Sequence, residues 1–245
     1  MLYGFITVRT SSNRLPKKCL LPFGEITVIE HVVRRTKSYG LHPIICTSTD
    51  PSDDILEEIA QKHGVDYFRG ALENKLLRWA DCATAYNIEN FHTVDADDLF
   101  FDGNEMKESL TVLSDHQADI VQPSKTSANG AGSVGYSLKT KVIKRALDGV
   151  SKEADTEMFW KYLEGLNNIH SVTMPDNPKT PKNVRLTLDY IEDYWLLESV
   201  RRMVGGLAPR SEIDELFSVN PDLHQVNWFR NSEWKSLQAV KSSLP

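Results

Sequence analysis

The sequence lacks the long apolar segments and the paired cysteines that mark membrane proteins and disulfide-stabilised proteins. No run of about 18 apolar residues occurs, and no cationic segment precedes the short apolar run at the N-terminus, so we expect neither a membrane span nor a signal peptide. Cys19, Cys46 and Cys82 are odd in number and widely spaced, with no CxxC pair. We therefore expect reduced thiols in a cytoplasmic protein.

The sequence also has no excess of basic residues. The 28 Lys and Arg residues stand against 34 Asp and Glu residues, which gives a formal net charge of −6. This acidic balance argues against a protein that binds nucleic acids or membrane surfaces in general, and we expect neither as a partner.

Several catalytic motifs are also missing. The sequence contains no GxxxxGK[ST] loop, no HExxH pair and no GxSxG elbow, which argues against P-loop enzymes, zinc proteases of the HExxH type and α/β-hydrolases. Residues Gly130–Gly135 match GxGxxG, but a polar loop precedes them and a strand-like segment follows. A dinucleotide site requires a strand before the glycines and a helix after them, so we expect a plain loop here.

What the sequence does contain is a cationic segment directly after its first apolar run. This segment, Ile6–Lys18, reads ITVRTSSNRLPKK. The side chains in it that can hold an anion are Arg9, Ser11, Ser12, Asn13, Arg14, Lys17 and Lys18. Ser and Asn favour turns whose N–H groups can point at one centre, and Arg and Lys side chains suit phosphate oxygens. The segment therefore predicts a phosphate site, with a solvated basic loop as the alternative.

Short apolar runs and amphipathic segments alternate through the first half of the chain. Strands are expected after the first one at 43–48, 65–68, 91–94 and 118–122, and helices at 28–37, 53–63, 71–86 and 106–113. Such strand–helix repeats predict a three-layer α/β fold. Its mostly parallel, Rossmann-like sheet would have helices on both faces, with ligands at the carboxyl ends of the strands.

The second half of the chain is less regular, although we treat residues 1–245 as one domain. A Ser/Gly/Asn loop spans 124–135, and the tail from Trp228 is expected to be peripheral. Further strands are expected at 134–138, 169–174 and 184–188, and further helices at 140–147, 156–163, 194–204 and 211–217.

Carboxylates follow two of the predicted strands. Asp95, Asp97 and Asp98 come directly after the strand that ends at Val94, and Asp189 follows VRLTL. Carboxylates in these places can hold Mg²⁺, which takes oxygen ligands and bridges phosphates. The alternatives are a solvated acidic turn for the first group and an N-cap for Asp189. Combined with the cationic segment, these residues outline a nucleoside triphosphate–metal site.

A strand–turn–helix unit brings three further charged residues to the same predicted edge. These are Arg69, Glu73 and Arg78. Either they line the nucleotide pocket or they are ordinary charges on a helix surface.

These segments resemble the motifs of the cytidylyltransferase family. This family includes the enzymes that make CMP-ketodeoxyoctonate and CMP-sialic acid, and the spore-coat polysaccharide group. VRTSSNRLPKKCLLPFG is similar to the opening motif A-R-x-x-S-x-R-L-P-x-K-x-L. The matching positions are Arg9, Ser12, Arg14, Leu15, Pro16, Lys18 and Leu20. VDADDLFFD and VRLTLDYIEDY resemble the stretches that carry the family's metal aspartates, here Asp97 and Asp189. The resemblance covers about residues 3–227, and Ala96, Leu99, Asn74 and Lys75 depart from the usual residues.

The resemblance implies an enzyme that transfers CMP from CTP to an acceptor hydroxyl and releases pyrophosphate. The expected acceptor is a 2-keto-3-deoxy sugar acid for surface polysaccharide. Arg14 and Lys18 would hold the β- and γ-phosphates, and Arg9 with Ser11, Ser12 and Asn13 the rest of the triphosphate. Arg69 and Arg78 would contact the base or ribose, and Asp97 and Asp189 would hold Mg²⁺. The resemblance also implies a homodimer, with an inserted arm at about 124–182 that crosses to the partner.

Two other hypotheses stay open at this point. The first is a nucleotidyltransferase with another acceptor or another nucleoside triphosphate. The second is a non-catalytic nucleotide-binding partner protein, which the changed residues around Asp97 suggest. Pyrophosphate release with a panel of acceptors separates them.

Overall fold

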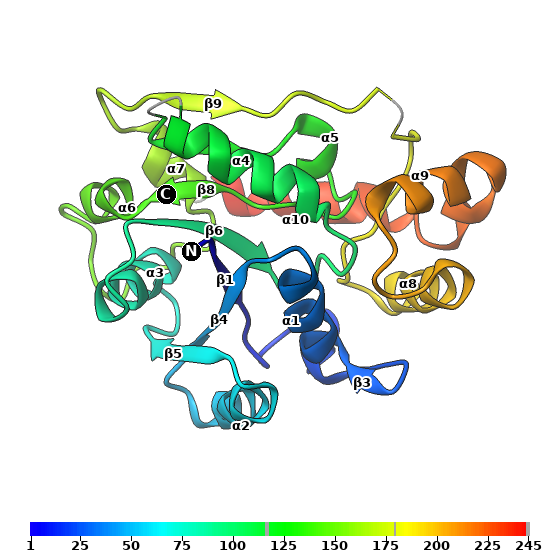
Figure 1. Ribbon diagram of the computed structural model, residues 1–245, viewed down its shortest axis with the longest axis horizontal. Coiled ribbons are helices and arrows are strands. Elements are labelled where there is room, and N and C mark those ends of the chain that lie inside the picture. The colour runs from blue at the N-terminus through cyan, green and yellow to red at the C-terminus, as the bar shows by residue number, and fades with distance from the viewer. Residues whose placement is uncertain (116–117, 179, 244–245) are drawn as a thin grey trace.

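The computed structural model describes residues 1–115, 118–178 and 180–243. Within them, seven strands form one sheet in the order β5-β4-β1-β6-β8-β7-β9 (Figure 1). The strands are β1 (Tyr3–Thr7), β4 (His42–Ser48), β5 (Asp66–Gly70), β6 (Asn90–Asp95), β7 (Ile120–Gln122), β8 (Ser137–Lys139) and β9 (Ser171–Thr173). All neighbours are parallel except β8, which is antiparallel to β6 and β7. The predicted mostly parallel α/β fold is confirmed.

Helices cover both faces of this sheet because successive strand residues point to opposite sides. Ile6 and Ile45 pack into one apolar cluster, and their neighbours Phe5 and Ile44 pack into another. The first cluster receives α1 (Val28–Ser38), α2 (Asp54–His63) and α4 (Gly103–Asp115). The second receives α3 (Lys75–Ala85), α6 (Thr140–Ala146) and α7 (Trp160–Glu164). The helices predicted in the first half of the chain are confirmed, with ends shifted by a few residues.

Helix ends follow the local sequence. Thr27 and Glu30 form a reciprocal capping box at the start of α1, and Gly64 ends α2 in the left-handed region, as its sequence position predicts. A short hairpin, β2 (Pro22–Phe23) with β3 (Ile26–Thr27), was not predicted. It leads the chain from the cationic segment into α1.

The C-terminal part of the chain forms α8 (Ile191–Val204), α9 (Arg210–Val219), the 3-10 turn η3 (Leu223–Val226) and α10 (Arg230–Ser243). A third apolar cluster joins α8 and α9 to residues that follow β6, such as Phe100. Figure 1 shows α10 in red, running from the side of α8 and α9 back toward β8. The prediction of a peripheral tail is wrong, because α10 contributes side chains to the candidate site described below.

The strand predicted at 184–188 is also wrong. The segment is extended, but it forms only an isolated bridge between Thr187 and Asp98. Its N–H groups bond to two different loops, Leu186 to the carbonyl of Gly130 and Leu188 to that of Asp97, both at 2.8 Å. Because no continuous strand lies beside it, no ladder develops.

Residues 124–182, predicted as an inserted arm, are partly built into the sheet. They supply β8, β9 and α6, besides the short helix α5 (Lys125–Ala128). The glycines of the GxGxxG match lie in a loop, with positive φ at Gly130, Gly132 and Gly135, as expected. Lys179, within this segment, falls outside the described residues. Whether part of this segment crosses to a partner stays a prediction.

Among the described residues, no helix is both long enough and apolar enough to cross a membrane.

Candidate active site

The cationic segment after β1 lines a cavity at the carboxyl ends of β1 and β6. This cavity has a volume of about 520 Å³. Its lining includes six of the seven predicted anion-binding residues, namely Arg9, Ser11, Ser12, Asn13, Arg14 and Lys18, but not Lys17. Asp95 and Asp97, at the end of the neighbouring strand, line the same cavity. The loop therefore faces the acidic turn, as its position in the sequence predicts.

Lys18 joins the two predicted metal aspartates. Its Nζ donates to Asp97 Oδ2 at 2.7 Å, to Asp189 Oδ1 at 3.0 Å and to the carbonyl of Leu188 at 2.8 Å. Arg14 Nη2 donates to the same oxygen of Asp189. Two carboxylates far apart in the sequence therefore converge on one ammonium group.

The two carboxylates carry opposite pKa shifts. Burial alone would raise the pKa of Asp189, but Lys18 and Arg14 lower it to about 2. Burial raises the pKa of Asp97, and the charges of Asp189 and Asp95 add to this rise against the pull of Lys18. Burial alone would lower the pKa of Lys18, yet Asp97 and Asp189 raise it. Lys18 therefore stays charged, and its charge opposes the effect of burial on the pKa of Asp97.

Asp98 differs from its neighbour Asp97. It is buried, and Thr187 donates a hydrogen bond to its carboxyl group. Burial and the nearby charge of Asp97 raise the pKa of Asp98 well above its ordinary value. Asp98 thus holds the 184–190 segment against the end of β6 rather than presenting a charge to the first cavity.

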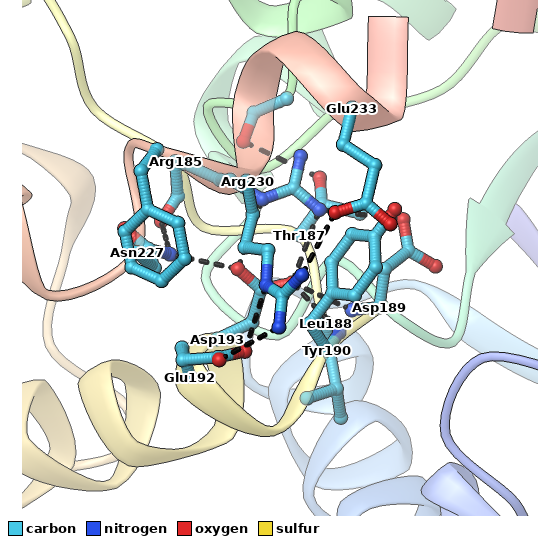
Figure 2. Close-up of polar contacts among 12 residues, drawn as sticks. Arg185, Thr187, Leu188, Asp189, Tyr190, Glu192, Asp193, Asn227, Arg230 and Glu233 are labelled. Atoms are coloured by element: carbon cyan, nitrogen blue, oxygen red, sulfur yellow. Dashed lines mark hydrogen bonds and ion pairs between the residues drawn. The ribbon is translucent and has the colours of Figure 1, made fainter. Parts of the chain in front are cut away.

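A buried network fixes the segment that carries Asp189 (Figure 2). Arg185 is fully buried and donates from Nε and Nη2 to the two oxygens of Asp193, at 2.9 and 3.0 Å. Asp193 Oδ2 also accepts from the backbone N–H groups of Asp189 and Tyr190, each at 2.9 Å. Asn227 donates to Asp193 Oδ1 and to the carbonyl of Arg185.

This network decides between the two interpretations of Asp189. Tyr190 is the N-cap of α8, and Asp193 accepts the hydrogen bonds from the backbone before the helix. The side chain of Asp189 instead contacts Arg14, Lys18 and Arg185. The capping alternative for Asp189 is therefore wrong.

Arg69 and Arg78 have different surroundings. Arg78 is buried, lines the cavity, and donates to the carbonyls of Ala71 and Leu72, so it is not a helix-surface charge. Arg69 binds Asp54 and Glu57 and the carbonyls of Ser48 and Asp50, and it lines neither of the cavities described here. The geometry therefore offers no support for a nucleotide contact by Arg69.

A second cavity, of about 690 Å³, adjoins the first. Arg14, Asp95 and Asp97 line both cavities, and Asp189 lines the second. Its other lining residues include four aromatic side chains, Tyr136, Phe159, Trp160 and Trp234, and the acidic Glu157 and Glu164. The cavity that contains the cationic segment thus adjoins one that includes several aromatic side chains, and the two aspartates lie at their border.

Lys75 is a site residue that sequence analysis did not find. Its Nζ contacts Asp95 at 3.1 Å and lies over the rings of Trp79 and Phe159. Burial alone would lower the pKa of Lys75, but Asp95 and Glu157 raise it. Its side chain lines both cavities. The one available signal was its departure from the usual family residue.

The donor set fits a hard divalent cation. Within the described residues, no group of three or more His, Cys, Asp or Glu side chains is arranged to hold a metal. Asp97 and Asp189 offer only carboxylate oxygens, and a bound cation would favour the charged form of Asp97, whose pKa is raised by burial and then by the charges of Asp189 and Asp95. Mg²⁺ commonly takes one or two protein carboxylates together with substrate phosphates and water. These residues therefore fit Mg²⁺ bound jointly with a nucleotide.

Comparisons with a family model and with a known relative point to the same family. A family model described as Cytidylyltransferase matches residues 4–163. The spore coat polysaccharide biosynthesis protein SpsF of Bacillus subtilis (strain 168) is 26% identical over 227 residues, covering 89% of this chain and 94% of the relative.

Two solved structures share the fold. A cytidylyltransferase from Leptospira borgpetersenii serovar Hardjo-bovis (strain JB197) has a TM-score of 0.80 at 24% identity, covering 91% of this chain and 96% of its own. CMP:2-keto-3-deoxy-manno-octonic acid synthetase, in complex with CTP, has a TM-score of 0.61 at 14% identity, covering 82% and 98%.

Proposed function

Because the chain belongs to the cytidylyltransferase family, we propose that it transfers CMP from CTP to a hydroxyl group of a small acceptor and releases pyrophosphate. The observation that carries this proposal is the convergence of Asp97 and Asp189 on Lys18, beside Arg14 and at the border of two cavities. A reaction that transfers a group from one substrate to another needs the two binding sites to adjoin at the reacting groups.

The first cavity is the proposed nucleotide side. Arg14 and Lys18 would bind the β- and γ-phosphates, since arginine forks and lysine charges suit phosphate oxygens. Arg9 and the loop Ser11–Asn13 line the rest of this cavity and would contact the remaining phosphate oxygens. Arg78 lies in its wall and is the better candidate of the two arginines for a base or ribose contact.

In the reaction, the acceptor oxygen attacks the α-phosphorus in line. The bond between the α-phosphorus and the oxygen that links it to the β-phosphorus breaks, and pyrophosphate leaves. The chain's own residues hold the two substrates and neutralise charge, which is most of what phosphoryl-type transfer requires. Asp97 and Asp189 would hold Mg²⁺, which when bound offsets the phosphate charge and activates the acceptor oxygen.

The second cavity is the proposed acceptor side, and we propose a 2-keto-3-deoxy sugar acid as its ligand. Two likenesses support this choice: the relative named for spore coat polysaccharide biosynthesis and the fold shared with a synthetase named for 3-deoxy-manno-octonic acid. A homodimer and a cytoplasmic location, implied by the same resemblance and by composition, stay predictions.

The test is pyrophosphate release from CTP, ATP, GTP and UTP with Mg²⁺, each with and without ketodeoxyoctonate or N-acetylneuraminate. We expect release that depends on both CTP and an acidic sugar. A purine nucleotide as the best substrate would contradict cytidylyl transfer. CTP binding without release for any acceptor would favour the non-catalytic alternative.

A further inference from the structure

The C-terminal helix α10 lies over the border between the two cavities. Leu237 lines the first cavity together with Arg14. Trp234 and Lys235, less than one turn earlier, line the second cavity together with Asp97 and Asp189. One turn of α10 therefore faces the place where the proposed transfer occurs.

This helix is tied to the segment that carries Asp189 (Figure 2). Arg230 binds Glu192 at the start of α8, at 2.9 Å, and Glu233 one turn along α10, at 2.8 Å. The guanidinium of Arg185 lies 5.3 Å from the ring centroid of Trp234, in cation–π contact. Contacts to both α8 and Arg185 therefore set the place of Trp234 relative to Asp189.

The cations around the border differ in whether they already form an ion pair. Arg14 is engaged by Asp189, and Lys75 by Asp95. Lys235 is exposed and makes no ion pair with any residue in the described part of the chain. An anionic group that enters the second cavity would therefore meet, in Lys235, a cation that no carboxylate already holds.

The chemistry of a 2-keto-3-deoxy sugar acid places its anionic group at this border. In the ring form the hydroxyl that attacks phosphorus and the carboxylate are bonded to the same carbon. When that hydroxyl faces the α-phosphorus, the carboxylate lies within a few ångströms of it. The remaining ring faces the aromatic walls, and flat aromatic side chains pack well on the apolar faces of sugars.

We propose that α10 forms a wall of the acceptor site, with Lys235 binding the acceptor's carboxylate and Trp234 packing on its sugar ring. This inference rests on the proposed function, because it names which residues read the acceptor in that reaction. It makes Lys235 and Trp234 determinants of acceptor specificity.

The first test measures KM for CTP and for ketodeoxyoctonate in Lys235→Ala and Trp234→Ala. Each variant should raise the acceptor KM about tenfold, as the loss of one charge-assisted or aromatic contact does, with an unchanged KM for CTP. Lys107→Ala on α4 and Trp195→Ala on α8, both exposed and outside the two cavities, are matched controls that should behave as wild type. An unchanged acceptor KM in both α10 variants would overturn the proposal.

A second test needs no turnover. Titration calorimetry compares ketodeoxyoctonate with its methyl ester, for wild type and Lys235→Ala. Wild type should prefer the acid about tenfold, and Lys235→Ala should lose this preference. A preference for the ester, no binding of either sugar, or a preference that survives in Lys235→Ala would each overturn the inference. If wild type binds the acid in this way but never releases pyrophosphate from CTP, the proposed function fails and the α10 site stands.

Discussion

The two aspartates at the centre of the site are held by different means. Asp97 follows β6, whose backbone forms ladders with β1 on one side and β8 on the other. Asp189 lies in a segment with no ladder, where Arg185, Asp193 and Asn227 take the place of a neighbouring strand. Backbone hydrogen bonds survive the replacement of a side chain, whereas an ionic network does not. The sheet half of the site should therefore tolerate substitutions that the ionic half does not.

The largest effect is expected at the aspartates themselves. Asp97→Asn and Asp189→Asn should each abolish turnover while the protein stays folded, because an amide keeps the shape and removes the charge that offsets Mg²⁺. Initial rates of pyrophosphate release, with circular dichroism as the folding check, measure this. Asp95→Asn is the control in the same turn, and it should lose far less. An essential Asp95 with a dispensable Asp97 would show that the wrong carboxylate had been assigned.

The next largest effect is a loss of stability, which should be larger in the ionic network around Asp189 than in the sheet that carries Asp97. Arg185→Met leaves the Asp193 carboxylate buried without its cation, and removing one partner of a buried pair costs about 3–5 kcal/mol. In the sheet half, Asp54→Asn breaks the ion pair with Arg69 on β5, in which both side chains are partly exposed, and should cost under about 1 kcal/mol. Urea unfolding of both variants gives the comparison. Equal losses would mean that the ionic network supports Asp189 no more than the ladder supports Asp97.

The part of the site held by the sheet could be predicted from the sequence, whereas the part held by the ionic network could not. The strand–helix repeats were predictable because apolar residues such as Ile44 and Ile45 sit in short runs between helical patterns, and this places Asp97 at the sheet edge. The position of Asp189 was predicted for the wrong reason. VRLTL has strand-like alternation, but its partners are loops distant in sequence.

Residues that act through tertiary contacts gave no such signal. No pattern in the sequence singled out Arg185 or Asp193, yet both are fully buried. Trp234 and Lys235 lie in a polar stretch that predicts a peripheral tail. Which face of a short polar helix meets the site depends on where the chain turns before it, and local patterns do not encode that direction.

A smaller loss of activity is expected in the cationic segment. Arg14→Ala and Lys18→Ala should each lower turnover ~10²–10³-fold, as loss of a preorganised charge-stabilising donor does. Because both side chains serve one anion, the double variant should lose less than the product of the two. Lys17→Gly is a matched control, since Lys17 has a φ of 53° and lines neither cavity. Near-normal rates in both alanine variants would remove these residues from the site.

The smallest effect is on stability, and it places the two regions in different pH windows. In the sheet, burial lowers the pKa of His92 to about 4, so the unfolded chain takes up this proton first and stability falls between about pH 6.5 and 4. In the ionic segment the pKa of Asp189 is about 2, so its contribution is lost only as the pH falls from about 4 to 2.

Unfolding free energies measured against pH should show both windows, with up to about 3 kcal/mol from His92. His92→Gln should shrink the first window, to which His31 also contributes because burial lowers its pKa to about 4, and should leave the second unchanged. Asp189→Asn should shrink the second window, to which Glu30 also contributes with a pKa of about 2, and should leave the first unchanged. If both variants changed stability in the same pH window, this would contradict the separation.

The most direct test of the account is a double-mutant cycle on Asp97 and Asp189. The quantity measured is the gain in CTP affinity that Mg²⁺ produces, by titration calorimetry with and without the ion. If the sheet and the ionic segment supply one metal–nucleotide site, each single Asn variant loses this gain and the double variant loses nothing further. If the two losses multiply in the double variant, or if Mg²⁺ strengthens CTP binding in either single variant as it does in wild type, the two aspartates do not form one site.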